Sequence, residues 1–125
     1  MEITLDLLKE LTQSEEMMWV IGGGQAVSEN HAHGIKVPEV SKGWATIEAD
    51  NWHFHLSLEL VDGIQFVEAK SHGDIKSYYV RFSKGWEDTL VRCYFPNPYL
   101  DEREARTEFQ PAKLKTFEEM RDRYV

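Results

Sequence analysis

Hydrophobic positions in the middle of the chain recur at every second residue. From residue 44 the segments "WATIEA", "WHFHLSLELV" and "IQFVEAKSH" alternate in this way, and Asp50-Asn51 and Asp62-Gly63 separate them. Alternation predicts β-strands with one buried face, and Asp-Gly between two such segments is typical of a tight hairpin turn. Two more strands are predicted at about 76–83 and 89–95. We therefore expect a five-stranded antiparallel meander.

Both ends of the chain show helical spacing instead. Leu5, Leu8 and Leu11 recur every three residues, so the segment 4–21 predicts one broken helix or two short ones. Near the other end, Thr116 and Glu119 have the spacing of a capping box, which predicts a C-terminal helix. The fold class is thus α+β, with an antiparallel sheet flanked by N-terminal and C-terminal helices. Because no linker or repeat interrupts the composition, we expect a single domain over residues 1–125.

Two-residue turns would fix the register of this meander. His53 would then lie opposite Glu48 and His72, and His55 would lie opposite Thr46. One face of the predicted sheet is apolar. The other face collects imidazoles, carboxylates, hydroxyls and two large aromatic side chains: Trp44, Thr46, Glu48, His53, His55, Ser57, Glu59, Phe66 and His72.

This polar face suggests three kinds of function. Neutral imidazole is a ligand of transition metals and of haem iron, so the face could bind either. A divalent metal would take the four donors His53, His55, His72 and Glu59, in a small cupin-like enzyme whose His-x-His-x-x-x-Glu core the chain reproduces without the flanking glycines. Alternatively, the histidines are idle on the solvated face of a non-catalytic interaction domain. Lys70, Lys76, Arg81 and Arg92, in or beside strands, could pair with anionic groups of a ligand or be ordinary surface charge.

Charge and composition exclude several other classes. A net charge of −8 without a basic cluster argues against a nucleic-acid partner. No apolar stretch is long enough for a membrane helix, and the N-terminus lacks the pattern of a secretory signal. The single cysteine, Cys93, agrees with a reducing cytoplasm.

The segments "GGGQAVSENHAHGIKVPEV", "WATIEADNWHFHLSLELVDGIQFVE", "SYYVRF" and "LVRCYF" resemble the ChuX/HutX-type haem-utilisation family over roughly residues 20–96. The resemblance implies a curved antiparallel sheet flanked by helices, a homodimer formed by extending the sheet, and a cytoplasmic carrier of haem or a related tetrapyrrole rather than an enzyme. His53 and His55 match the family's histidine strand, and His31 or His33 falls in the segment before it. With the polar face, the expected haem contacts are His53, His55, His33, His31, His72, Trp44 and Phe66.

Overall fold

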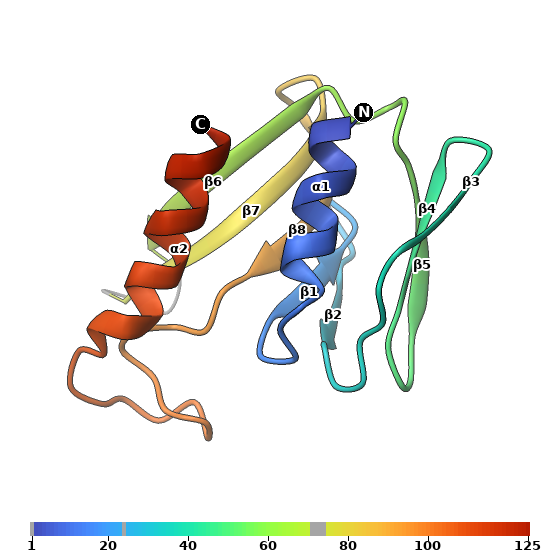
Figure 1. Ribbon diagram of the computed structural model, residues 1–125. Coiled ribbons are helices and arrows are strands. Elements are labelled where there is room, and N and C mark those ends of the chain that lie inside the picture. The colour runs from blue at the N-terminus through green and yellow to red at the C-terminus, as the bar shows by residue number, and fades with distance from the viewer. Residues whose placement is uncertain (1, 24, 71–74) are drawn as a thin grey trace.

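The computed structural model describes residues 2–23, 25–70 and 75–125, and these contain two helices and two antiparallel sheets (Figure 1). The helices are α1 (Glu2–Leu11) and α2 (Pro111–Tyr124). The larger sheet has the strand order β2-β1-β8-β7-β6 and consists of β1 (Met18–Ile21), β2 (Ser28–His31), β6 (Gly63–Lys70), β7 (Lys76–Lys84) and β8 (Asp88–Tyr94). The smaller sheet has the order β3-β4-β5 and consists of β3 (Glu39–Ser41), β4 (Trp44–Glu48) and β5 (His53–Ser57). The predicted α+β class with flanking helices is confirmed.

Both helices lie against the same face of the five-stranded sheet, and the smaller sheet stands beside α1 (Figure 1). The leucine stripe of α1 is fully buried, as its spacing predicts. On α2, Phe117 and Met120 are the buried side chains, and the Phe117 ring contacts β7 through Tyr78 at 5.2 Å between centroids. Buried side chains of both helices and both sheets form one hydrophobic cluster.

Helix α2 starts at Pro111, which suits the first turn of a helix because proline has no N–H to bond. The predicted cap at Thr116 is therefore wrong, since Thr116 lies inside the helix.

The N-terminal helical segment is shorter than predicted. Residues 18–21, "MWVI", form β1 rather than a second helix. A four-residue apolar run has no readable period, and here it pairs on both sides, Trp19 lying opposite Asn30 on β2 and Cys93 on β8. Pairing with distant strands thus decides its conformation.

The hairpin between β4 and β5 follows the predicted register, with His55 opposite Thr46 and His53 opposite Glu48. The predicted hairpin at Asp62-Gly63 is wrong. There β6 pairs with β7, Gly63 lying opposite Ser83, and β5 is an edge strand of the other sheet. Asp62 instead accepts a hydrogen bond from the backbone N–H of Gly85, in the β7–β8 turn. The chain therefore crosses between the sheets at this point, and β5 does not pair with β6 as the two-residue turn predicted.

Tyr124, near the end of α2, connects the two helices. Its hydroxyl donates to the carboxylate of Glu10 on α1, which also accepts a bond from Arg123. Burial, assisted by the bond to Glu10, raises the pKa of Tyr124 from 10.0 to about 12. The unfolded chain therefore loses this proton at a lower pH than the folded chain does, and the stability that Tyr124 contributes should be lost as the pH rises from about 10 to about 12.

We expect Tyr124→Phe to remove this part of the alkaline destabilisation. Thermal unfolding followed by circular dichroism at pH 9, 10, 11 and 12 should show a shallower fall in melting temperature for the variant than for the wild type. Other tyrosines with raised pKa values continue to contribute in both proteins. Equal slopes would show that the Tyr124–Glu10 bond adds nothing.

Candidate functional site

His53 and His55 lie on the exposed face of the small sheet. Their rings are 5.3 Å apart between centroids, and the Thr46 hydroxyl lies 2.9 Å from His55 Nδ1. Trp44 lies on the same face, one strand over, and its side chain is 50% exposed. The structure therefore brings these two imidazoles together with one indole, as the β4–β5 register predicts.

One other member of the predicted face, Phe66, does not join them. Phe66 lies on β6 of the larger sheet and packs against α2, 5.8 Å from the Phe117 ring and 6.4 Å from the Tyr124 ring between centroids. Placing it beside the histidines was wrong, because that depended on pairing β5 with β6. His72 lies outside the described residues.

The predicted metal donors that the structure describes, His53, His55 and Glu59, form no recognisable centre. Among residues 2–23, 25–70 and 75–125, no group of three or more His, Cys, Asp or Glu side chains could hold a metal ion. Glu59 lies beyond the end of β5, in the turn that leaves the small sheet. The metal-dependent enzyme thus has no support in the described part of the structure.

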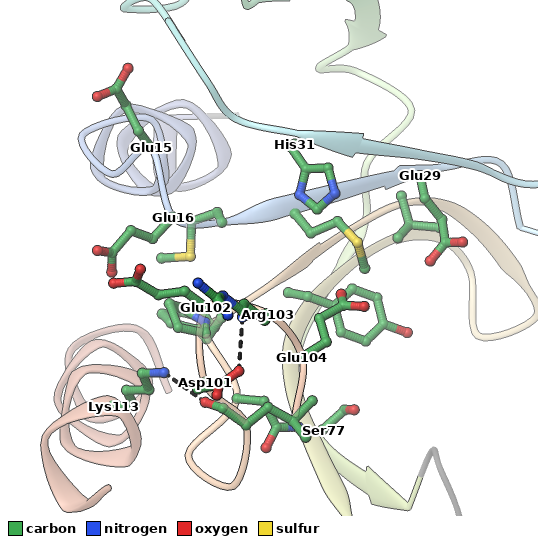
Figure 2. A pocket seen from close by; sticks show the side chains of 18 of the residues that line it. Glu15, Glu16, Glu29, His31, Ser77, Asp101, Glu102, Arg103, Glu104 and Lys113 are labelled. Carbon is green, nitrogen blue, oxygen red and sulfur yellow. Dashed lines mark hydrogen bonds between the residues drawn. The ribbon is translucent and has the colours of Figure 1, made fainter. Parts of the chain in front are cut away.

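His31 and His33 line a different feature, an open groove of about 1250 Å³ (Figure 2). It extends from the start of α2, where Lys113 lies, over the face of the five-stranded sheet that carries Met18, Val20, Arg92 and Tyr94, here called the groove face. Figure 2 shows His31 pointing into the groove from β2. Neither His53 nor His55 lines it, so the two histidine pairs occupy separate surfaces.

The turn between β4 and β5 holds the backbone of the groove histidines. Trp52 Nε1 donates to the carbonyl oxygen of His31 at 2.6 Å, and the Asp50 N–H donates to the carbonyl oxygen of His33 at 3.0 Å. The small sheet therefore fixes the position of the segment from which both imidazoles project.

The groove has an apolar floor and charged sides. The uncharged lining includes two thioethers and two aromatic rings: Met17, Met18, Tyr94 and Phe95. Three cationic side chains line it, Arg92, Arg103 and Lys113, together with six carboxylates: Glu15, Glu16, Glu29, Asp101, Glu102 and Glu104. Figure 2 shows His31 and Glu29 on one side, facing the segment before α2 that carries Asp101, Glu102 and Glu104. The charges lie around the apolar part rather than replacing it.

Tyr94 and Arg92 form a compact unit on the groove face. The Tyr94 ring lies 4.6 Å from the Tyr79 ring between centroids, and the Arg92 guanidinium carbon is 5.9 Å from each centroid. Burial raises the pKa of the Tyr94 hydroxyl, and the Arg92 charge opposes that shift. Sequence reasoning did not assign Tyr94 to a site. The alternation in "LVRCYF" places Arg92 and Tyr94 on one face of a strand, but β1 and β2, which complete the wall, were not expected as strands.

Comparisons with known proteins agree with this architecture. A protein-family model matches residues 5–120. No curated protein shows significant similarity to the chain. A protein from Agrobacterium tumefaciens has 21% identity and a TM-score of 0.71, with 99% of this chain and 66% of that chain covered. A protein from Erwinia carotovora has 13% identity and a TM-score of 0.72, with 99% of this chain and 71% of that chain covered. The haem-binding protein ChuX has 9% identity and a TM-score of 0.70, with 94% of this chain and 70% of that chain covered.

This chain thus spans about two thirds of the length of the structures that it matches. No helix in the described part of the chain is long and apolar enough to cross a membrane. The family match extends from α1 into α2, and the fold agrees across nearly the whole chain. The chain has the fold of the ChuX/HutX-type proteins.

Proposed function

We propose that the protein binds haem or a related tetrapyrrole and that the groove beside His31 is the binding site. The observation that supports this most directly is an imidazole projecting into a groove of about 1250 Å³ with an apolar, aromatic floor. Pockets for small ligands commonly occupy roughly 300–1000 Å³, so the groove has room for a macrocycle. The fold is shared with the haem-binding protein ChuX.

The residues present fit this group chemically. Imidazole and thioether groups can coordinate haem iron, and His31 and Met18, which lie opposite each other on neighbouring strands, are the residues that would hold it. The half-buried Tyr94 ring supplies apolar surface for a planar ring, and the buried Met17 and Phe95 side chains support the floor behind it. Bound haem would supply an iron centre, and the chain's own residues would hold it, orient the ring and shield it from water.

The remaining parts of the proposal follow the family resemblance. We expect a cytoplasmic carrier that acts as a homodimer, with no catalytic residue assigned. The single cysteine supports a reducing compartment, because Cys93 is buried and has no partner for a disulfide.

The His53–His55 face is a second candidate site for the same ligand. Two neighbouring imidazoles and the half-exposed Trp44 favour it. Unlike the groove, it is the flat face of a three-stranded sheet, so it offers a wall on one side only. We therefore place the ligand in the groove and treat this face as the alternative.

A hemin titration tests the function and separates the two surfaces. The wild-type protein should give a shifted, saturable Soret band at about one equivalent. The double variant His31→Ala/His33→Ala should bind hemin at least about tenfold more weakly, which corresponds to roughly 1.4 kcal/mol. The matched double variant His53→Ala/His55→Ala should bind like the wild type.

The opposite pattern would move the site to the small sheet. A wild-type protein that gives no saturable band would reject the proposed function and leave a non-catalytic interaction domain as the best description.

A further inference from the structure

Two arginines lie directly opposite each other on the groove face. Arg81 on β7 pairs across the ladder with Arg92 on β8, and both side chains are half buried. Like charges at directly opposed positions destabilise a sheet unless something compensates them. Within residues 2–23, 25–70 and 75–125, neither guanidinium forms an ion pair with a carboxylate. The chain has a net charge of −8 and therefore many carboxylates, so two neighbouring arginines that pair with none of them require an explanation.

Arg81 is fixed by neutral acceptors. Its Nε donates to the Thr89 hydroxyl at 2.6 Å, its Nη1 to the Gln65 side chain at 2.7 Å, and its Nη2 to the Trp86 carbonyl at 2.7 Å. Each of its three nitrogens therefore has an acceptor, and Arg81 does not line the groove. Arg92, the second arginine, lacks such a set of acceptors.

Arg92 has few partners and does line the groove. The one hydrogen bond of its side chain in the described structure runs from Nη1 to the Tyr94 hydroxyl at 3.3 Å, and its Nε is buried without a partner. The rings of Tyr79 and Tyr94 hold the guanidinium at 5.9 Å from each centroid, which limits its rotamers. A guanidinium that is partly desolvated, restrained and short of acceptors is prepared to bind an anion in two-point fashion.

The carboxylates of the groove do not fill this role. Glu29 is the acid whose place on the groove face is fixed by the same ladder, and it lies two strands from Arg92, across Val20. Two strand spacings amount to about 10 Å between the backbones, and no ion pair joins the two side chains. The acids of the 101–104 segment, on the opposite side of the groove, make no ion pair or hydrogen bond with Arg92 either.

We propose that Arg92 is an anion-recognition residue of the groove, which binds a carboxylate side group of the ligand. The inference rests on the proposed function and makes it more specific: the ligand is a tetrapyrrole with free carboxylates, held by one of them at Arg92 while its ring covers the floor beside Tyr94. The surrounding carboxylates disfavour any orientation that turns the acidic edge of the ligand away from Arg92.

Hemin and hemin dimethyl ester, in which both propionates are esterified, provide the test. In one detergent-containing buffer, the wild-type protein should bind hemin about tenfold more tightly than the ester, because only hemin offers a carboxylate. Arg92→Gln should lose this preference by weakening hemin binding, with the ester's Kd unchanged. Arg121→Gln, which removes an arginine of α2 outside the groove, should keep the preference.

The outcomes separate this inference from the proposed function. If wild type binds both compounds equally, or if Arg92→Gln retains the preference for hemin, the role of Arg92 is rejected while haem binding stands. A wild-type protein that binds neither compound rejects both. The wild-type comparison decides the question even if Arg92→Gln does not fold.

Discussion

Replacing Phe117 by alanine should lower the free energy of unfolding by about 3–5 kcal/mol, the cost of truncating a buried phenylalanine. Phe117 is 1% exposed, and three aromatic rings surround it: those of Phe66, Tyr78 and Phe95 lie 5.8, 5.2 and 5.2 Å away between centroids. These rings belong to β6, β7 and the segment after β8. The largest buried side chain of α2 thus attaches that helix to the sheet, and its loss would leave a cavity bounded by rigid rings.

The matched control is Phe109→Ala. Phe109 is 44% exposed and contacts the Tyr99 ring at 5.3 Å between centroids, so its loss should cost less than about 1 kcal/mol. Urea unfolding of the three proteins, followed by circular dichroism, measures both effects. A Phe117→Ala variant as stable as Phe109→Ala would mean that α2 does not depend on this contact.

Local signals predicted the parts of the fold that local contacts build. The β4–β5 hairpin follows from two alternating segments joined by a short turn, and its register places Thr46 opposite His55, as the sequence indicates. The first helix follows from its leucine spacing. In both cases the residues that determine the structure are close together in the chain.

At Asp62-Gly63 the local sequence signals a hairpin turn as strongly as it does between β4 and β5, but contacts between distant residues overrode it. The Asp62 N–H donates to the Ser83 carbonyl, and the Asp62 carboxylate accepts from the Gly85 N–H. Both bonds therefore go to the turn end of the β7–β8 hairpin. The dipeptide signals a turn, but it cannot signal which strand comes next in space. All errors in the predicted polar face, including the placement of Phe66, follow from this single crossing.

The candidate groove depends even more on distant pairing. Its wall joins β2, β1 and β8, in which Met18 lies between His31 and Tyr94. The histidines could be singled out from the sequence, and Arg92 could be named as a cation for an anionic ligand. Their common surface could not be predicted, because β1 pairs with a strand about 70 residues further along the chain, beyond any local pattern.

Trp19, on the helix-facing side of β1, should be the second residue whose loss severely destabilises the protein. Its side chain is fully buried and lies 5.8 Å from the Phe54 ring of the small sheet between centroids, so it joins the two sheets. We expect Trp19→Ala to cost about 3–5 kcal/mol in the free energy of unfolding. Since β1 also supplies Met18 and Val20 to the groove, hemin binding should weaken with it at temperatures near the lowered melting point.

Trp19→Phe isolates packing from hydrogen bonding at this position. The indole Nε1–H is buried and has no partner in the described structure, so phenylalanine removes an unpaired donor while it keeps most of the ring. The cost should therefore be about 1–2 kcal/mol, clearly below that of alanine. Urea unfolding of both variants measures the difference. If phenylalanine costs as much as alanine, the indole nitrogen has a partner that stabilises the fold, and the contact with Phe54 is not what joins the sheets.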